Sequence, residues 1–364
     1  MKALTRPGLR TLVLQHAAAF DASAAANPFA SAEWTLHFID QVARDDWQFW
    51  AAGDSGGLML LYAEASRPGE LHALTNYYAS LYSPAIASAS GRPDAAAAVA
   101  ALMSADQAVA TVDLAPMAQA EADGLQQTFR AAGWMTRRYS CFGNWYLPCE
   151  DLSFEQFMAA RPSQLQHTWR RKARKFKPGA AQARLQMVTA PAEVEAAMQA
   201  YATVYAQSWK QAEPYPTFVR DWAYICAEQG WLRLGIAWVG ETPIAAQFWF
   251  TMNRRAYIFK LAYDEAHAQW SAGTVLSAFL FQHSLDVDRV VEIDYLTGDD
   301  AYKQSWMTER RERVGVIACN PRSWRGLMRG AYEWAGALRQ RWRPAAAAPV
   351  PLAAPAAAEE ARTA

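Results

Sequence analysis

The fold is decided by residues 231–306, which read WLRLGIAWVGETPIAAQFWFTMNRRAYIFKLAYDEAHAQWSAGTVLSAFLFQHSLDVDRVVEIDYLTGDDAYKQSW. Three apolar runs come first, separated by short turn segments, at 232–239, 243–250 and 255–263. Aromatic and β-branched residues bounded by turn residues predict a three-stranded antiparallel meander. The apolar run 275–285 is too long for a typical strand and predicts a buried helix, and 290–296 predicts a further strand.

A glycine-containing loop precedes the predicted helix, and this order of elements has a chemical use. The free N–H groups and the partial positive charge at a helix N-terminus can hold a phosphate. Gly273 has no side chain where the backbone would approach such an anion, and Ser271 could cap the helix or donate to the phosphate. The sequence therefore predicts an anion site at Ser271, Ala272, Gly273 and Thr274.

Five short motifs in this stretch suggest a family: Pro243-Ile244-Ala245-Ala246, Lys260-Leu261-Ala262-Tyr263-Asp264, Ser271-Ala272-Gly273-Thr274, Glu292-Ile293-Asp294 and Gly298-Asp299-Asp300-Ala301-Tyr302-Lys303-Gln304-Ser305-Trp306. Together they resemble the cofactor half of a GNAT-superfamily acyltransferase of the BioF-like and CelD-like acetyltransferase branch, which is related to the FemABX transferases. The resemblance implies that acetyl-CoA or another acyl-CoA binds at the loop, with Lys260 nearby. The superfamily loop usually has Gly-x-Gly/Ala, whereas here Gln269 is followed by one glycine only, Gly273.

The composition is that of a globular protein, and the spacing of cysteines and histidines gives no metal site. The 364 residues suffice for two domains, with 52% apolar and 19% charged residues and a formal net charge of zero. Overall charge therefore gives no strong signal for nucleic-acid binding. The four cysteines form no C-x-x-C pair and no histidine spacing completes a zinc site, so we expect no metal. Scattered thiols suit a reducing, cytoplasmic location.

A similar order of elements recurs in the first half of the chain. The predicted helix, three strands, helix and strand fall at 32–42, 47–51, 58–63, 70–78, 94–102 and 109–114. Asp113 and Asp294 hold matching places, 181 residues apart. We therefore predict two degenerate copies of one α/β unit, at residues 1–150 and 151–320. The FemABX-like relatives also carry tandem units.

The resemblance implies that each copy is a mixed, mostly antiparallel sheet flanked by helices, within the α+β class. In the first copy, Ser83-Pro84-Ala85 is not followed by a glycine and a helix. We therefore expect the first copy to lack a working cofactor site and to serve as a partner surface.

A basic helix is predicted between the copies, at residues 163–177. Arg170 and Arg171 are candidate substrate ligands, because the guanidinium fork matches phosphate and carboxylate groups. A solvated linker face is the alternative. A nucleic-acid arm is disfavoured, because the rest of the chain is not basic.

Two helices are expected to precede the meander, after Pro191 and at 218–228. In GNAT-like folds such helices flank the acceptor cleft. Trp209, at the end of the first, is a candidate platform for a sugar, with burial as the alternative.

Acyl transfer from a thioester needs a base for the acceptor, donors for the oxyanion and an acid for the leaving thiolate. Asp294, on a predicted strand, is the candidate base or acceptor orienter, and a structural hydrogen bond is the competing interpretation. The resemblance makes Tyr302 the candidate acid, with packing as the alternative. Lys303 is the third candidate catalytic residue, as a neutralising charge for a phosphate or for developing charge.

Two further carboxylates are candidate substrate ligands, Asp264 and Asp299. A structural pair of Asp264 with Lys260 is the alternative for the first, and capping of the next helix, together with Asp300, is the alternative for the second. A helix at 307–313 and a strand at 314–319 are expected to complete the second copy.

The chain closes with a basic amphipathic segment, 321–343, which predicts a helix that either covers the domain or rests on a membrane surface. The Ala/Pro-rich tail 344–364 is predicted to be disordered.

The leading hypothesis is an acyltransferase that moves an acetyl or acyl group from acyl-CoA to an amine or hydroxyl of a sugar or polysaccharide precursor by direct attack. Two alternatives stay open. One is a FemABX-like aminoacyl transferase that uses aminoacyl-tRNA, and the other is a non-catalytic tandem GNAT scaffold that binds a glycan or a partner.

Overall fold

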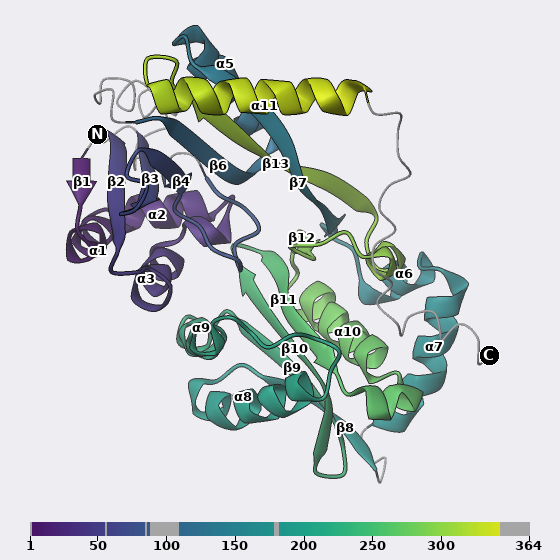
Figure 1. Ribbon diagram of the computed structural model, residues 1–364. Helices are drawn as coiled ribbons and strands as arrows, with labels where there is room; N and C mark the ends of the chain where they lie inside the picture. The colour runs from purple at the N-terminus through teal and green to yellow at the C-terminus, as the bar shows by residue number, and fades with distance from the viewer. Residues whose placement is uncertain (1, 55–56, 84–85, 88–108, 178–181, 343–364) are drawn as a thin grey trace.

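The computed structural model describes residues 2–54, 57–83, 86–87, 109–177 and 182–342 (Figure 1). The predicted helix at 94–102 and the predicted disordered tail at 344–364 lie outside these ranges.

The second half is built on the predicted meander. Strands β9 (Leu232–Val239), β10 (Thr242–Met252) and β11 (Arg255–Tyr263) pair antiparallel in chain order. Asn253 and Arg254, which join the last two strands, have φ of 51° and 57°, as the tight turn of a two-residue hairpin requires. Strand β8 (Ala183–Val188) adds beside β9, and helices α8 (Pro191–Ala206) and α9 (Pro216–Glu228) lie between β8 and β9 in the chain.

A crossover helix then returns the chain to the sheet. It comprises a 3₁₀ turn (Glu265–Trp270), α10 (Ala272–Gln282) and one π-helical turn (His283–Val287). Strand β12 (Glu292–Asp294) pairs parallel to β11 for only three residues, ending at the pair Tyr257–Asp294. Beyond this pair β11 continues to Tyr263 without β12 beside it, and we call this unpaired end of β11 the opening. Tyr263, at its end, lies beside Gly273 in the first turn of α10.

The first half repeats this arrangement. Strands β2 (Trp47–Asp54), β3 (Gly57–Glu64) and β4 (Glu70–Ala73) form an antiparallel run, and β6 (Thr111–Ala118) pairs parallel to β4 for three residues. The remaining elements of this half are β1 (Lys2–Leu4), α1 (Arg6–Gln15), α2 (Ala17–Ala24), a 3₁₀ turn (Pro28–Ala30), α3 (Ala32–Gln41), β5 (Ile86–Ala87) and α5 (Gln119–Ala131).

The last strands of the two halves join them into one sheet. Strand β7 (Met135–Pro148), from the first half, pairs with β12, and β13 (Glu309–Cys319), from the second, pairs with β6. The two strands also pair antiparallel with each other over almost their whole length. The strand order of the joined sheet is β1-β2-β3-β4-β6-β13-β7-β12-β11-β10-β9-β8. The helix expected at 307–313 is wrong, because β7 offers those residues a strand partner that local sequence does not reveal.

Helices cover both faces of the second half (Figure 1). On one face α8 and α9 pack with α3 over a core that contains Trp222, Phe248 and Phe250. On the other, α10 packs with α6 (Phe154–Ala159) and α7 (Ser163–Ala173) over Trp249 and Phe281; a 3₁₀ turn (Arg174–Phe176) extends α7. Helix α11 (Trp324–Trp342) lies against β13 and β7. The predicted α/β architecture, with a mixed, mostly antiparallel sheet flanked by helices, is confirmed.

No described helix combines the length and the apolar character needed to span a bilayer.

Candidate functional site

The N-terminus of α10 opens directly after β11. Ser271 precedes the helix in the left-handed conformation, at φ 49°, and its side chain makes no capping bond. Within the described residues, no hydrogen bond takes up the N–H groups of Ala272, Gly273 or Thr274, as expected for the first turn of a helix. The Gly273 carbonyl accepts from Gln247 Nε2 at 3.1 Å, which fixes the turn against β10. The geometry suits an anion, and the predicted cofactor role of this loop stays a prediction.

A β-bulge in β11 turns Lys260 away from α10. The pairing with β10 shifts between Phe248 and Trp249, so that Phe259 has no partner across the pair. The extra residue places Lys260 opposite Phe248, on the sheet face that packs against α8. There its ammonium lies 2.8 Å from Glu213. Lys260 thus lies on the sheet face opposite α10, and its predicted cofactor role stays a prediction.

The loop between α8 and α9 covers this end of β11. Glu213 from the loop pairs with Lys260 and accepts a hydrogen bond from the Tyr78 hydroxyl at 2.9 Å. The Lys260 ammonium also lies 4.5 Å from the centre of the Tyr78 ring. Tyr78 belongs to the first half, so both halves contribute side chains to one polar cluster.

Lys210, from the same loop, has an altered acidity. Burial, together with the nearby positive charge of Lys260, lowers its pKa to about 8. Lys210 has no carboxylate within ion-pair distance among the described residues. The charges of Lys303 and Asp300 also act on the pKa of Lys210, the first lowering it and the second raising it.

Trp209 lies beside the start of α10. Its ring is 4.7 Å from that of Tyr263, centre to centre, and a Cβ on Gly273 would lie 3.7 Å from the Tyr263 ring. Trp209 is 39% exposed, so its face remains available to a ligand. Its predicted role in binding substrate stays a prediction.

Tyr302 lies on the 3₁₀ turn Ala301–Ser305, just after β12. Its ring meets that of Tyr295 edge-on at 5.8 Å, and the two hydroxyl groups interact. Burial and the Asp300 carboxylate raise the pKa of Tyr302 above its usual value, so the phenol keeps its proton at neutral pH.

Lys303 is buried and holds the preceding loop together. Its ammonium donates to the carbonyls of Thr297 and Gly298, at 2.7 and 3.0 Å, and pairs with Asp300 at 3.1 Å. These three partners match the three donors of an ammonium, and the predicted catalytic role of Lys303 stays a prediction.

The other predicted carboxylates are engaged in structure. Asp299 accepts from Trp145 Nε1 at 2.7 Å and from Arg310 at 2.6 Å, and this guanidinium lowers the pKa of Asp299. Asp264 accepts from the Ala266 N–H at 2.9 Å and from His267. Asp264 thereby caps the 3₁₀ turn before α10. Asp264 does not pair with Lys260, and the predicted substrate-binding role of both carboxylates stays a prediction.

The basic helix α7 packs against α10 as a neighbour. Arg170 and Arg171 are exposed, and Arg170 donates to Gln166 at 3.3 Å. The contacts with the segment before α10 come instead from Lys172, which donates to the Gln269 carbonyl at 2.6 Å, and from Lys175. The role predicted for the two arginines stays a prediction.

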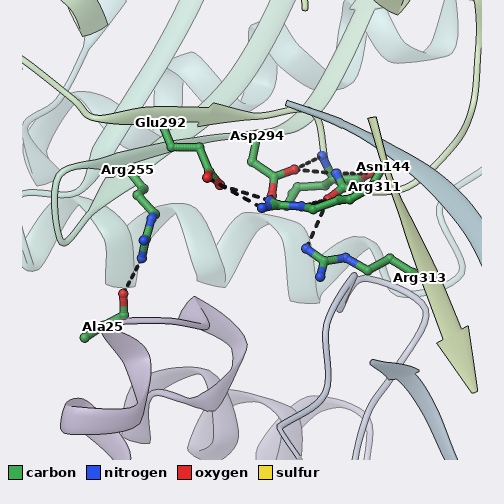
Figure 2. A network of polar contacts seen from close by, with 8 residues as sticks. Ala25, Asn144, Arg255, Glu292, Asp294, Arg311 and Arg313 are labelled. Carbon is green, nitrogen blue, oxygen red and sulfur yellow. Dashed lines mark hydrogen bonds and ion pairs between the residues drawn. The ribbon is translucent and has the colours of Figure 1, made fainter. Parts of the chain in front are cut away.

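Asp294 is the centre of a buried polar network at the junction of the halves (Figure 2). It is 3% exposed and accepts from Asn144 Nδ2 at 2.6 Å, from the Leu296 N–H at 2.7 Å and from Arg311. Arg311 also pairs with Glu292 at 2.9 Å. These partners fit the structural interpretation of Asp294, and its predicted role as base stays a prediction.

A cavity of about 230 Å³ adjoins this network, between the two halves. Its lining includes Asn27 and Glu121 from the first half and Arg255, Asp294 and Arg313 from the second. Tyr302 is not among its lining residues. Successive residues of a strand face opposite sides, so Asp294 faces this cavity while the neighbouring Tyr295 carries the contact with Tyr302.

Sequence reasoning missed several residues of both clusters: Tyr78, Asn144, Lys210, Glu213, Arg311 and Arg313. Residues 309–313 read ERRER, a run of five charged residues that marks the segment but not which side chains face the site. No local signal marks the others. Within the described residues, no group of His, Cys, Asp and Glu side chains is arranged to hold a metal ion.

Comparison with protein families finds a match in the second half of the chain. Residues 163–304 match the family model of the acetyltransferase (GNAT) domain. A search of curated proteins finds no match.

Solved structures resemble the whole fold at low identity. FemX is 8% identical, with 87% of this chain and 97% of that chain covered and a TM-score of 0.57. The C-terminal domain of a protein described as a lysylphosphatidylglycerol synthetase, from Agrobacterium fabrum, is 9% identical over 89% of this chain and 96% of that one, with a TM-score of 0.54. L-PGS from Bacillus licheniformis is 12% identical over 82% and 94%, with a TM-score of 0.50. Residues 163–304 therefore resemble a GNAT acetyltransferase domain, and the chain as a whole shares its fold with these structures.

Proposed function

We propose that the chain is an acyltransferase that takes its acyl group from acyl-CoA. The carrying observation is the N-terminus of α10, whose first N–H groups are unused within the described residues and lie beside the opening between β11 and β12. The coenzyme pyrophosphate binds these amides, and the pantetheine arm runs into the opening. The thioester then meets side chains from both strand ends and from the α8–α9 loop.

At the opening, Lys210 acts as the base and Tyr302 as the acid. The neutral amine of Lys210 takes a proton from the acceptor amine or hydroxyl, which attacks the thioester carbonyl. The new bond to the carbonyl carbon forms, the C–S bond breaks, and the thiolate leaves. Tyr302, whose raised pKa keeps it protonated, donates a hydrogen bond to the leaving sulfur. Holding both substrates in line supplies much of the rate.

A sugar or polysaccharide precursor fits the aromatic rim of the opening. Trp209 and Tyr77 are exposed there, and Tyr77 packs edge-on against Tyr78 at 5.2 Å. Flat aromatic faces with exposed edges suit the apolar faces and hydroxyl groups of sugar rings. This supports an amine or hydroxyl of a sugar as acceptor.

Aminoacyl transfer from aminoacyl-tRNA is the second candidate, as in the FemABX transferases that the sequence resembles. The observation in its favour is the exposed basic face of α7, with Arg170 and Arg171, next to α10. The zero net charge of the chain is the argument against it.

Calorimetric titration of the full chain with acetyl-CoA tests the proposal. Wild type is expected to bind. Gly273→Glu is expected to abolish binding, because its carboxylate would occupy the anion site and repel the pyrophosphate. Gly124→Glu is the matched control, since Gly124 lies on α5 with open space around it. Absence of binding by wild type, or equal binding by Gly273→Glu, would contradict acyl-CoA use.

Transfer of labelled acetyl groups to nucleotide sugars and glycans then identifies the acceptor. Product formed with wild type supports the enzyme, whereas acetyl-CoA binding without transfer to any acceptor supports a scaffold. A labelled aminoacyl group moved from aminoacyl-tRNA would support the second candidate.

A further inference from the structure

The outward face of α11 is apolar. Among the described residues ten large hydrophobic side chains are exposed, and half of them lie on this one helix. Their exposed fractions are 72% for Trp324, 51% for Leu327, 64% for Met328, 72% for Tyr332 and 64% for Trp334. We call this set the α11 aromatic face. An exposed apolar group of this size marks a contact surface.

The opposite face of α11 already packs on the sheet, and it does so through glycine. A Cβ on Gly326 would collide with the backbone oxygens of Asn320 and Ala110, and one on Gly330 would collide with Met135. Glu333 adds an ion pair to Arg137 of β7 at 2.5 Å. A helix that served only to cover the sheet would bury its aromatic side chains. Here the small residues face the protein and the aromatic residues face outward.

The same segment concentrates positive charge. Residues 321–343 contain six arginines and one glutamate, a net charge of +5, in a chain whose formal net charge is zero. The one glutamate, Glu333, is taken up by Arg137 and Arg329. Arg322 and Arg325, next to the aromatic face, have no ion-pair partner in the part of the chain that the structure describes.

We propose that the α11 aromatic face binds an anionic membrane surface, with the helix lying in the plane of the interface. Trp and Tyr rings settle at the boundary between headgroups and acyl chains, and flanking arginines attract anionic headgroups. A symmetric contact with a second copy would bring the same +5 segments face to face, which like-charge repulsion disfavours. Figure 1 shows α11 along the outside of the sheet, beside β13 and β7.

Co-sedimentation of the full chain with vesicles tests this inference. Wild type is expected to sediment with vesicles of phosphatidylglycerol and phosphatidylcholine, and not with phosphatidylcholine alone. The double variant Trp324→Gln with Tyr332→Gln is expected to lower the partition at least about tenfold. Arg322→Gln and Arg325→Gln are each expected to lower it about fivefold, and high salt should have the same effect.

The matched control is Leu14→Gln, which removes an exposed apolar side chain from α1 and is expected to sediment as wild type does. Thermal unfolding confirms that each variant is folded. Wild type that stays in solution with anionic vesicles overturns the proposal, as does unchanged binding by the double variant. A wild-type dimer in light scattering that dissociates in the double variant, without vesicle binding, overturns it in favour of self-association.

Discussion

At the level of single residues, two neighbouring lysines at the end of β11 have different surroundings. Lys260 is neutralised by Glu213 at 2.8 Å. Lys210 has no such partner among the described residues and feels both burial and the charge of Lys260, which lower its pKa to about 8. A base works best when its pKa lies near the working pH, which favours the proposed role of Lys210 in proton abstraction.

The pH profile of acyl transfer tests this role. We expect kcat/KM to rise with pH around pH 8, because Lys210 becomes a neutral amine above that value. Lys210→Met should remove this rise and lower kcat/KM at pH 8.5 by about a hundredfold. Lys177→Met, which changes an exposed lysine, is the control. Should the rise persist in Lys210→Met, another group is the base.

Asp294 is expected to matter for stability. Asp294→Asn keeps the shape but removes the charge that Arg311 and Asn144 contact, so we expect a loss of about 2 kcal/mol in the free energy of unfolding. Urea unfolding measures it. Asp123→Asn, in an exposed pair with Arg138, should cost about 0.5 kcal/mol or less. A stable Asp294→Asn protein that has lost only turnover would restore Asp294 as the base.

The sequence could identify Asp294 as unusual but could not assign its role. A carboxylate within an apolar strand needs partners, and that much follows from composition. The partners come from β7 and β13, and Asn144 lies 150 residues away along the chain. Such long-range contacts decide between catalysis and structure, and a single sequence does not contain them in readable form.

At the level of elements, local sequence patterns were sufficient for the meander and for the helix that follows it, whereas helices α1 and α2 were not predicted. The meander β9–β11 and helix α10 were predicted within a few residues, because turns and apolar runs determine them. The helix expected at 307–313 failed, because β13 is stabilised by β7, a strand from the other half. The bulge that turns Lys260 to the other face likewise depends on pairing with β10.

Strand β7 of the first half pairs with β12 and β13 of the second, and β13 pairs with β6 of the first. Because the sheet is continuous across the halves, we predict that the halves do not fold separately. Without residues 1–150, β12 and β13 lose the pairing that β7 provides, and exposed strand edges favour aggregation. We expect residues 151–364 alone to be insoluble or unfolded, and co-expression with residues 1–150 to recover a soluble complex. Circular dichroism and gel filtration measure this. A monomeric, folded 151–364 fragment would show that the second half is stable without its pairing to β7, and would contradict this prediction.

At the level of the whole molecule, both halves contribute side chains to the candidate site. Tyr78 bonds to Glu213 at the opening, and residues of both halves line the cavity beside Asp294. The tandem arrangement followed from the repeated order of elements, but the contribution of Tyr78 did not, because its partner lies 135 residues away. The proposed use of acyl-CoA depends on the N–H groups at the start of α10, which would bind the coenzyme pyrophosphate.

A crystal structure of the chain with coenzyme A tests that claim most directly. We predict pyrophosphate oxygens within hydrogen-bond distance of the N–H groups of Ala272, Gly273 and Thr274, with the thiol end between β11 and β12 near Lys210 and Tyr302. Coenzyme A bound elsewhere on the molecule, or bound with its pyrophosphate away from these amides, would contradict the account.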